Sequence, residues 1–143
     1  MIINNIIIYN HICFLLTKFV TVIYQKTKGS IMRIKTSEKY GAVVITIKGN
    51  VMGGPEAQEF HDLLGNFLDT GKSNIVIDLG GVKFMNSTGL GMLISGYTSV
   101  KNKGGALKLA NATDKINSLL VITKLITIFE NFESVDLAVE SFK

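Results

Sequence analysis

The 143-residue sequence has few residues of the kinds that build covalent or metal-bound frameworks: it holds one cysteine, Cys13, and two histidines, His11 and His61. A single cysteine can form neither a disulfide framework nor a cysteine-ligated zinc site within one chain. The histidines belong to no cluster of metal-ligand or catalytic-triad type, and we read His61 as an exposed or half-buried residue of a helix. The sequence therefore predicts no metal and no cofactor.

Excess positive charge is also missing from most of the chain, although the formal net charge is +4. Three lysines, Lys18, Lys26 and Lys28, lie in the first 31 residues, which contain no acid, so residues 32–143 hold 12 basic and 11 acidic side chains. A nearly neutral domain with scattered lysines has no electrostatic footprint for nucleic acid. Nucleic acid is therefore not a predicted direct partner.

Residues 1–31 form an apolar extension that lacks the marks of a membrane span or a signal peptide. Asn10, His11 and Lys18 interrupt the apolar segment, whereas a spanning helix needs about 20 mostly apolar residues. A signal peptide would have a basic start and a small-residue cleavage site, and neither is present. Because this composition is typical of translated AT-rich DNA, we predict a mis-called start upstream of Met32. A membrane anchor is the alternative, and only that alternative makes a membrane a partner.

Residues 32–143 carry the pattern of one α/β domain with a hydrophobic core. Apolar and β-branched runs predict strands over 33–39, 42–48, 75–79, 106–110 and 126–132. Apolar residues at three- and four-residue spacing predict helices over 56–69, 88–103, 115–123 and 135–142. Turns are predicted at 40–41 and 80–81, with a loop over 49–55. An initial hairpin followed by alternation predicts a mixed, mostly parallel sheet of about five strands with about four helices packed against it.

One stretch combines a strand end, a helix start and two hydroxyl side chains: Lys83-Phe84-Met85-Asn86-Ser87-Thr88-Gly89-Leu90-Gly91. The unpaired N–H groups of a helix N-terminus favour an oxygen ligand or a phosphate. Ser87 could simply cap the helix, but Asn86 can cap it as well and would leave Ser87 and Thr88 as exposed hydroxyls. The triplet Gly71-Lys72-Ser73 is not a phosphate-binding loop, because it closes a helix and precedes a strand.

This stretch and its surroundings resemble the STAS domains, specifically the bacterial anti-sigma factor antagonists. The resemblance covers nearly all of residues 32–143 and none of residues 1–31, and it includes Lys103-Gly104-Gly105, Ile122-Thr123-Lys124-Leu125 and Phe129. It implies a small α/β protein of the cytoplasm that is not an enzyme. Such a protein binds an anti-sigma factor that is also a serine kinase of the GHKL type, and thereby releases the sigma factor.

The resemblance also implies a switch. The kinase would phosphorylate the first hydroxyl residue of the motif, Ser87, with Thr88 as a possible second site, and a phosphatase of the PP2C class would reverse the reaction. The predicted partner-binding residues are Met52, Gly53, Asn86, Ser87, Thr88, Gly89 and Met92. Two positions depart from the family pattern: Asn86 stands where many members have Asp, and the loop 49–54 has no acid.

A second function belongs to a different class. STAS-like proteins also serve as accessory subunits of lipid-transport or membrane transporter complexes, and an authentic extension at residues 1–31 would favour that function. An enzyme is a weak third reading, because the sequence shows no metal cluster, phosphate loop or nucleophile–base pair.

Overall fold

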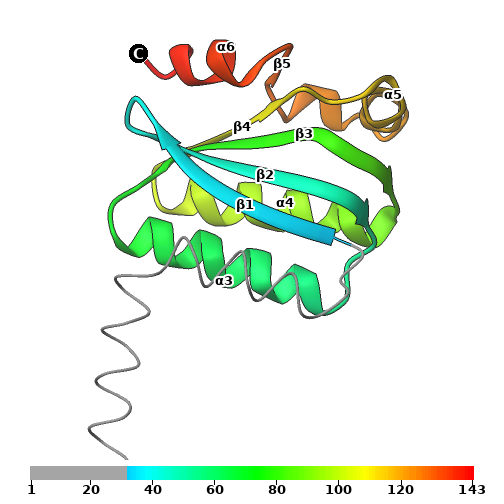
Figure 1. The fold of residues 1–143 in the computed structure, drawn as a ribbon, viewed down its shortest axis with the longest axis horizontal. Helices are drawn as coiled ribbons and strands as arrows, with labels where there is room; N and C mark the ends of the chain where they lie inside the picture. Colours follow the sequence, from blue (N-terminus) through cyan, green and yellow to red (C-terminus); the bar gives the residue numbers. More distant parts are fainter. Residues whose placement is uncertain (1–31) are drawn as a thin grey trace, which may run out of the picture. The chain divides into compact units, whose positions relative to one another are not determined.

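The computed structural model describes residues 32–143, so the predictions for the extension at residues 1–31 lie outside the described residues. Figure 1 shows a sheet with helices on both sides. The strands are β1 (Met32–Lys39), β2 (Ala42–Val51), β3 (Asn74–Met85), β4 (Ala106–Ala110) and β5 (Asn131–Phe132). The helices are α3 (Pro55–Asp69), α4 (Ser87–Asn102), α5 (Asp114–Ile122) and α6 (Val135–Glu140), with one 3₁₀ turn, η1 (Leu125–Thr127). None of the helices in this part of the chain is long and apolar enough to cross a membrane.

The sheet has the order β1-β2-β3-β4-β5, in which β1 and β2 pair antiparallel and the other neighbours pair parallel. The hairpin turns at Tyr40 and Gly41, which both have positive φ. Each later strand returns to the sheet through a helical connection, as parallel pairing requires. The predicted α/β class is confirmed, with five strands and four α-helices in residues 32–143.

Successive side chains of each strand point to opposite faces of the sheet, so the core has two parts. One face of the sheet carries Ile45, Ile47, Ile75 and Ile77, which pack with Phe60 and other residues of α3 and α4 in the larger core. The opposite face carries the small residues Ala42, Val44, Val76 and Ala110, which pack with Ala138 and Val139 of α6 in a second cluster. Figure 1 shows α3 and α4 side by side along one face and α6 across the other.

The predicted turn at Gly80-Gly81 is wrong, because β3 continues through both glycines to Met85. The pairing with β2 continues as Lys48 with Gly81 and Gly49 with Val82, across two register shifts. A Cβ on Gly81 would lie 2.6 Å from Cγ of Lys48, so glycine is needed where that side chain crosses the strand. These glycines therefore mark an irregular strand, and the predicted loop after Lys48 starts later, after Val51.

The predicted strand over 126–132 is wrong for its first five residues. Lys124 has a φ of 62° and is followed by the 3₁₀ turn η1, so only Asn131 and Phe132 pair with β4. Leu125 and Phe129 are both buried and four residues apart, which is helical spacing, and the N–H of Phe129 donates to the carbonyl of Leu125. The β-branched residues between them misled the strand prediction because they are exposed rather than alternating in the core.

Candidate functional site: the start of helix α4

Asn86, not Ser87, caps helix α4. The Asn86 side chain accepts a hydrogen bond from the N–H of Gly89 at 2.8 Å, and its carbonyl accepts from the N–H of Leu90 at 2.9 Å. Asn86 is in extended conformation, as an N-cap residue should be. The cap thus uses the amide side chain, and the hydroxyl of the next residue is left out of it.

We expect Asn86→Ala to lower the free energy of unfolding by about 1 kcal/mol, within a range of about 0.5–2, because it removes the cap of α4. Asn86→Asp is the matched variant: its carboxylate can accept the same bond and faces the positive end of the helix dipole, so it should retain stability. Urea denaturation of both variants measures the difference. Equal destabilisation by Ala and Asp would contradict the assignment of Asn86 as the cap.

Gly89 holds α4 against the end of strand β2. A Cβ on Gly89 would lie 2.1 Å from the carbonyl oxygen of Val51, which is closer than any side chain can approach. The N–H of Asn86 donates to the same carbonyl at 3.2 Å. Both contacts position the first turn of α4 beside the loop that follows β2.

Thr88 lies against Gly53 in that loop. A Cβ on Gly53 would lie 2.3 Å from Cγ2 of Thr88, and Gly53 and Gly54 both have a φ of 81°, which favours glycine. The Thr88 methyl group is therefore in contact with the loop. Of the predicted partner-binding residues, the structure brings Met52 and Gly53 on the loop together with Asn86 to Gly89 on the helix.

Ser87 is exposed at this junction, and its hydroxyl has no hydrogen-bond partner among residues 32–143. One turn along the same helix face, Gly91 is exposed, with nothing within 4 Å of where a Cβ would lie, and Ile94 follows with 38% of its surface exposed. The first turn of α4 contains no acidic side chain. We call Ser87, Gly91 and Ile94 the open face of α4. Along it lie the Ser87 hydroxyl, the open space beside Gly91 and the apolar side chain of Ile94.

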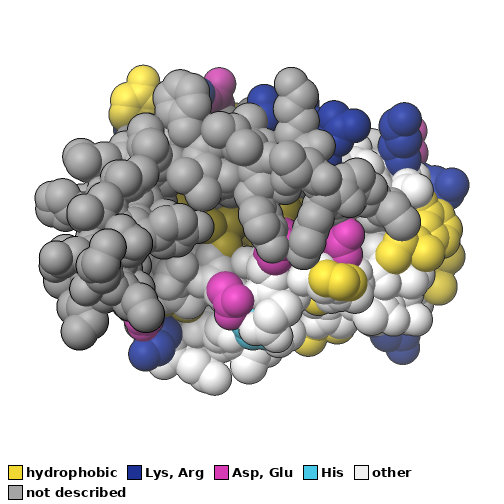
Figure 2. Space-filling model, turned by 60° about the horizontal axis from the view of Figure 1, so that its bottom comes forward, with side chains coloured by type: hydrophobic (Ala, Val, Ile, Leu, Met, Phe, Trp, Pro, Cys, Tyr) yellow, Lys and Arg dark blue, Asp and Glu magenta, His cyan; other side chains and the backbone are white. Residues whose placement is uncertain are grey.

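Hydrophobic side chains flank this face. Met52 is 42% exposed and Phe84 is 41% exposed. Figure 2 shows hydrophobic side chains gathered at the right-hand end of the molecule, which in Figure 1 is the end where β3 passes into α4. Met92, by contrast, is only 4% exposed and belongs to the larger core. Gly53 and Gly89 are also buried, so these three predicted residues support the surface from beneath rather than form it.

Glu56 adds a carboxylate that sequence reasoning missed. The loop 49–54 has no acid, but Glu56 in the first turn of α3 places Oε2 only 3.4 Å from the Cβ position of Gly54. The sequence signal for this carboxylate is Pro55, which starts α3 directly after Gly54 and thereby places Glu56 in the first turn. An acidic group therefore does lie beside the loop after β2.

His61 and Ser95 form the one serine–histidine contact in the described part of the chain. Nε2 of His61 lies 2.6 Å from Oγ of Ser95, in a half-buried position that joins α3 to α4. The 34-residue separation hid this pair from sequence reasoning. No carboxylate in residues 32–143 hydrogen-bonds the imidazole, and no group of three or more His, Cys, Asp or Glu side chains there could hold a metal. We read the pair as a bond between two helices.

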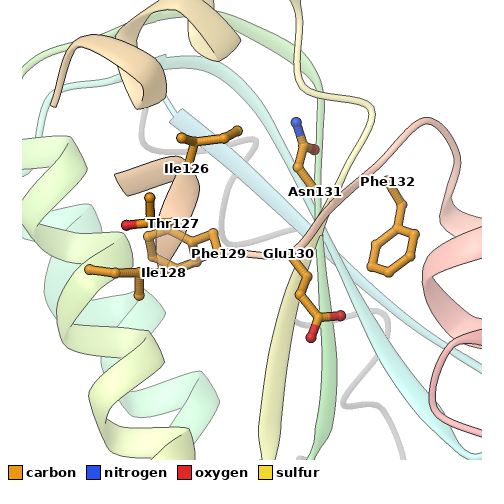
Figure 3. Close-up of a pocket in the computed structure, with 7 residues that line it drawn as sticks. All are labelled: Ile126, Thr127, Ile128, Phe129, Glu130, Asn131 and Phe132. Carbon is orange, nitrogen blue, oxygen red and sulfur yellow. The ribbon is translucent and has the colours of Figure 1, made fainter. Parts of the chain in front are cut away.

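A hollow of about 450 Å³ lies elsewhere, along residues 126–132. Figure 3 shows that its lining comes from one continuous segment, with Ile128 and Phe129 on the side of α4 and Phe132 on the other side. Its one charged side chain, Glu130, pairs with Lys108 at 3.3 Å. Its one hydroxyl, on Thr127, donates to the carbonyl of Lys124 at 2.7 Å. The lining therefore forms no nucleophile–base pair, and the hydroxyl-bearing start of α4 remains the better candidate site.

Comparison with known proteins bears on this site. The family model described as the STAS domain matches residues 33–138. A curated protein, the anti-sigma-B factor antagonist of Bacillus subtilis (strain 168), is 40% identical over 53 residues, which are 37% of this chain and 49% of that protein. The matched segment thus spans about half the length of this relative.

Solved structures share the fold. An anti-sigma factor antagonist from Mycobacterium paratuberculosis has a TM-score of 0.66 at 21% identity, covering 77% of this chain and 92% of that one. The Bacillus cell fate determinant SpoIIAA in its phosphorylated form has a TM-score of 0.62 at 14% identity, covering 77% and 99%. At these identities the agreement establishes the fold.

Proposed function

Because the chain belongs to the STAS domain family, we propose that it is an anti-sigma factor antagonist whose binding is switched by phosphorylation of Ser87. The observation that carries the proposal is the free, exposed Ser87 hydroxyl at the start of α4, beside a cap that Asn86 supplies. The curated relative, an anti-sigma-B factor antagonist, supports the class of function.

The partner in this proposal is an anti-sigma factor that is also a serine kinase of the GHKL type, and both act in the cytoplasm. The unmodified antagonist binds this partner over the open face of α4 and the loop at Met52 and Gly53. Phosphorylation of Ser87 ends the binding, and a PP2C-type phosphatase restores it. The antagonist itself performs no chemistry in this cycle.

The start of α4 can accept a phosphate on Ser87 without refolding. A phosphate adds about −1.5 to −2 charge, and the N–H groups and dipole of a helix N-terminus favour an anion. The first turn of α4 itself contains no acidic side chain that would repel the phosphate. A partner surface fitted to a neutral hydroxyl, however, would have to desolvate that charge, so the complex is weakened while the fold persists.

Ser87 is a better acceptor than Thr88 for a geometric reason. The Thr88 methyl group packs over Gly53, which ties its rotamer to the loop, whereas Ser87 is exposed and its hydroxyl has no hydrogen-bond partner in residues 32–143. A kinase must draw the hydroxyl into its own site. The unconstrained side chain can enter that site at lower cost.

Affinity capture tests the proposal. Full-length Ser87→Ala protein, immobilised and exposed to a lysate of native cells, should retain an anti-sigma factor with a GHKL-type ATPase fold, identified by mass spectrometry. Thr88→Ser is the matched control: it keeps both hydroxyls and should capture the same protein from a lysate depleted of ATP, in which Ser87 stays unmodified. Capture of a transporter ATPase or channel in place of an anti-sigma factor would contradict the proposal and favour the accessory-subunit function.

A further inference from the structure

Within residues 32–143, the face of the sheet opposite α3 and α4 is only partly covered by helices. Helix α6 packs against β3, β4 and β5, and its core cluster reaches β2 only at Ala42 and Val44. Toward the other end of the hairpin, the same face of β1 and β2 carries the exposed side chains of Arg33, Lys35 and Lys48. We call these three residues the cationic face.

The cationic face places side chains of like charge next to one another, which is electrostatically unfavourable. Arg33 pairs directly with Lys48 across the antiparallel ladder, and Lys35 lies two residues further along the same face. Like charges directly opposite one another destabilise a sheet. The side-chain ion pairs within residues 32–143 are Lys39–Asp136, Lys72–Glu38 and Lys108–Glu130, so none of the three cations is neutralised there.

Protection of the sheet edge does not explain this arrangement. Charged residues on an edge strand prevent edge-to-edge association, and this would account for Arg33 and Lys35 on β1. It does not account for Lys48, which is on the inner strand β2 and lies across Gly81 of β3. Because Lys48 lies one strand inward, the three cations form a surface patch that edge protection does not require.

The spacing of the Arg33 and Lys35 side chains indicates the kind of ligand that the cationic face would bind. Arg33 and Lys35 are alternate residues of an edge strand, so their side chains repeat at about 7 Å on one face. A strand added beside β1 would place its own alternate side chains at the same interval, with main-chain hydrogen bonds to the outer edge of β1. Residues 32–143 are nearly neutral, with 12 basic and 11 acidic side chains, so they lack the summed field that draws nucleic acid or an anionic membrane.

We propose that β1 is a docking site for an extended acidic segment of a partner protein, which adds to the sheet as a strand. Carboxylates on its alternate residues face Arg33 and Lys35, and Lys48 lies behind them on the adjacent strand. This site lies on the sheet edge and does not rest on the switch proposed for Ser87.

The test uses the full-length protein and a fluorescent decapeptide of alternating glutamate and valine, with binding measured by anisotropy. We expect Arg33→Gln/Lys35→Gln/Lys48→Gln to weaken binding at least about tenfold, since several charge pairs are lost together. The matched control, Lys101→Gln/Lys103→Gln/Lys124→Gln, removes the same charge elsewhere and should stay within about twofold. A peptide with glutamine for glutamate should bind at least about tenfold more weakly than the glutamate peptide.

Two further readouts separate this proposal from its alternatives. The bound peptide should slow amide hydrogen exchange in β1, and Ser87→Glu should leave peptide binding unchanged. Equal weakening by both triple variants would overturn the proposal, because net charge would then explain the binding. Absence of peptide binding would overturn it too, as would tighter binding to phosphatidylserine vesicles or to an oligonucleotide that depends on the same three residues.

Discussion

Replacing Ser87 with glutamate is expected to weaken binding to the anti-sigma factor by at least about 100-fold. An uncompensated carboxylate in the interface costs roughly 3 kcal/mol of desolvation, which corresponds to this factor. Ser87 is exposed on the open face of α4, so a partner that covers this face must cover the new charge. Titration calorimetry with the captured partner measures the loss.

Two variants separate charge from size and from position. Ser87→Gln has nearly the shape of Ser87→Glu without its charge, and it should lose much less affinity. Ser118→Glu adds the same charge at an exposed position of α5 and should have little effect. If Ser87→Gln binds as weakly as Ser87→Glu, steric exclusion rather than charge controls the site, and a charge switch is ruled out.

Gly89→Ala is expected to lower the free energy of unfolding by at least about 2 kcal/mol, the upper part of the range for overpacking. The new Cβ would lie 2.1 Å from the carbonyl oxygen of Val51, and neither a helix backbone nor a strand backbone can rotate away as a side chain can. Urea denaturation measures the loss, and binding should fall with it because the loop at Met52 and Gly53 would move relative to Ser87.

Gly91→Ala is the matched control two residues away in the same helix. Nothing lies within 4 Å of a Cβ at Gly91, so alanine should fit and raise stability by about 0.5–1 kcal/mol through its higher helix propensity. Opposite signs for the two substitutions would support the described packing of α4 on β2. Equal tolerance of alanine at both positions would contradict it.

The sequence predicted most of the framework because local signals and tertiary packing agree there. The helix predicted over 88–103 contains several small residues. Gly89 lies against Val51 of β2, and Gly96 lies against α3, where a Cβ would be 2.9 Å from the Phe60 ring. Gly91, in the same small-residue pattern, faces open space. Which glycines are needed for packing depends on the rotation of the helix, which composition does not reveal.

The errors arose where a local signal competed with a long-range one. Gly80-Gly81 has the composition of a turn, but pairing with β2 keeps it in a strand. The run 126–132 has the composition of a strand, but burial of Leu125 and Phe129 on one side of η1 makes its start helical. In both places the decisive partner is distant in sequence.

The candidate site was predicted in kind but not in detail. The Ser87 region and the possible capping role of Asn86 follow from the sequence, and the structure confirms the cap. The burial of Met92 and the placement of Glu56 beside Gly54 depend on how α3, α4 and the loop after β2 meet. Those contacts determine which predicted residues a partner can touch.

The most direct test of the switch is the phosphorylation state of one peptide from native cells. Trypsin should release residues 84–101, cut after Lys83 and Lys101, and fragmentation can distinguish phosphate on Ser87 from phosphate on Thr88, Ser95, Thr98 or Ser99. We predict a phosphorylated fraction on Ser87 that falls when the partner's sigma factor becomes active. A peptide that stays unmodified under both conditions, or carries phosphate only at another residue, would contradict the proposed function.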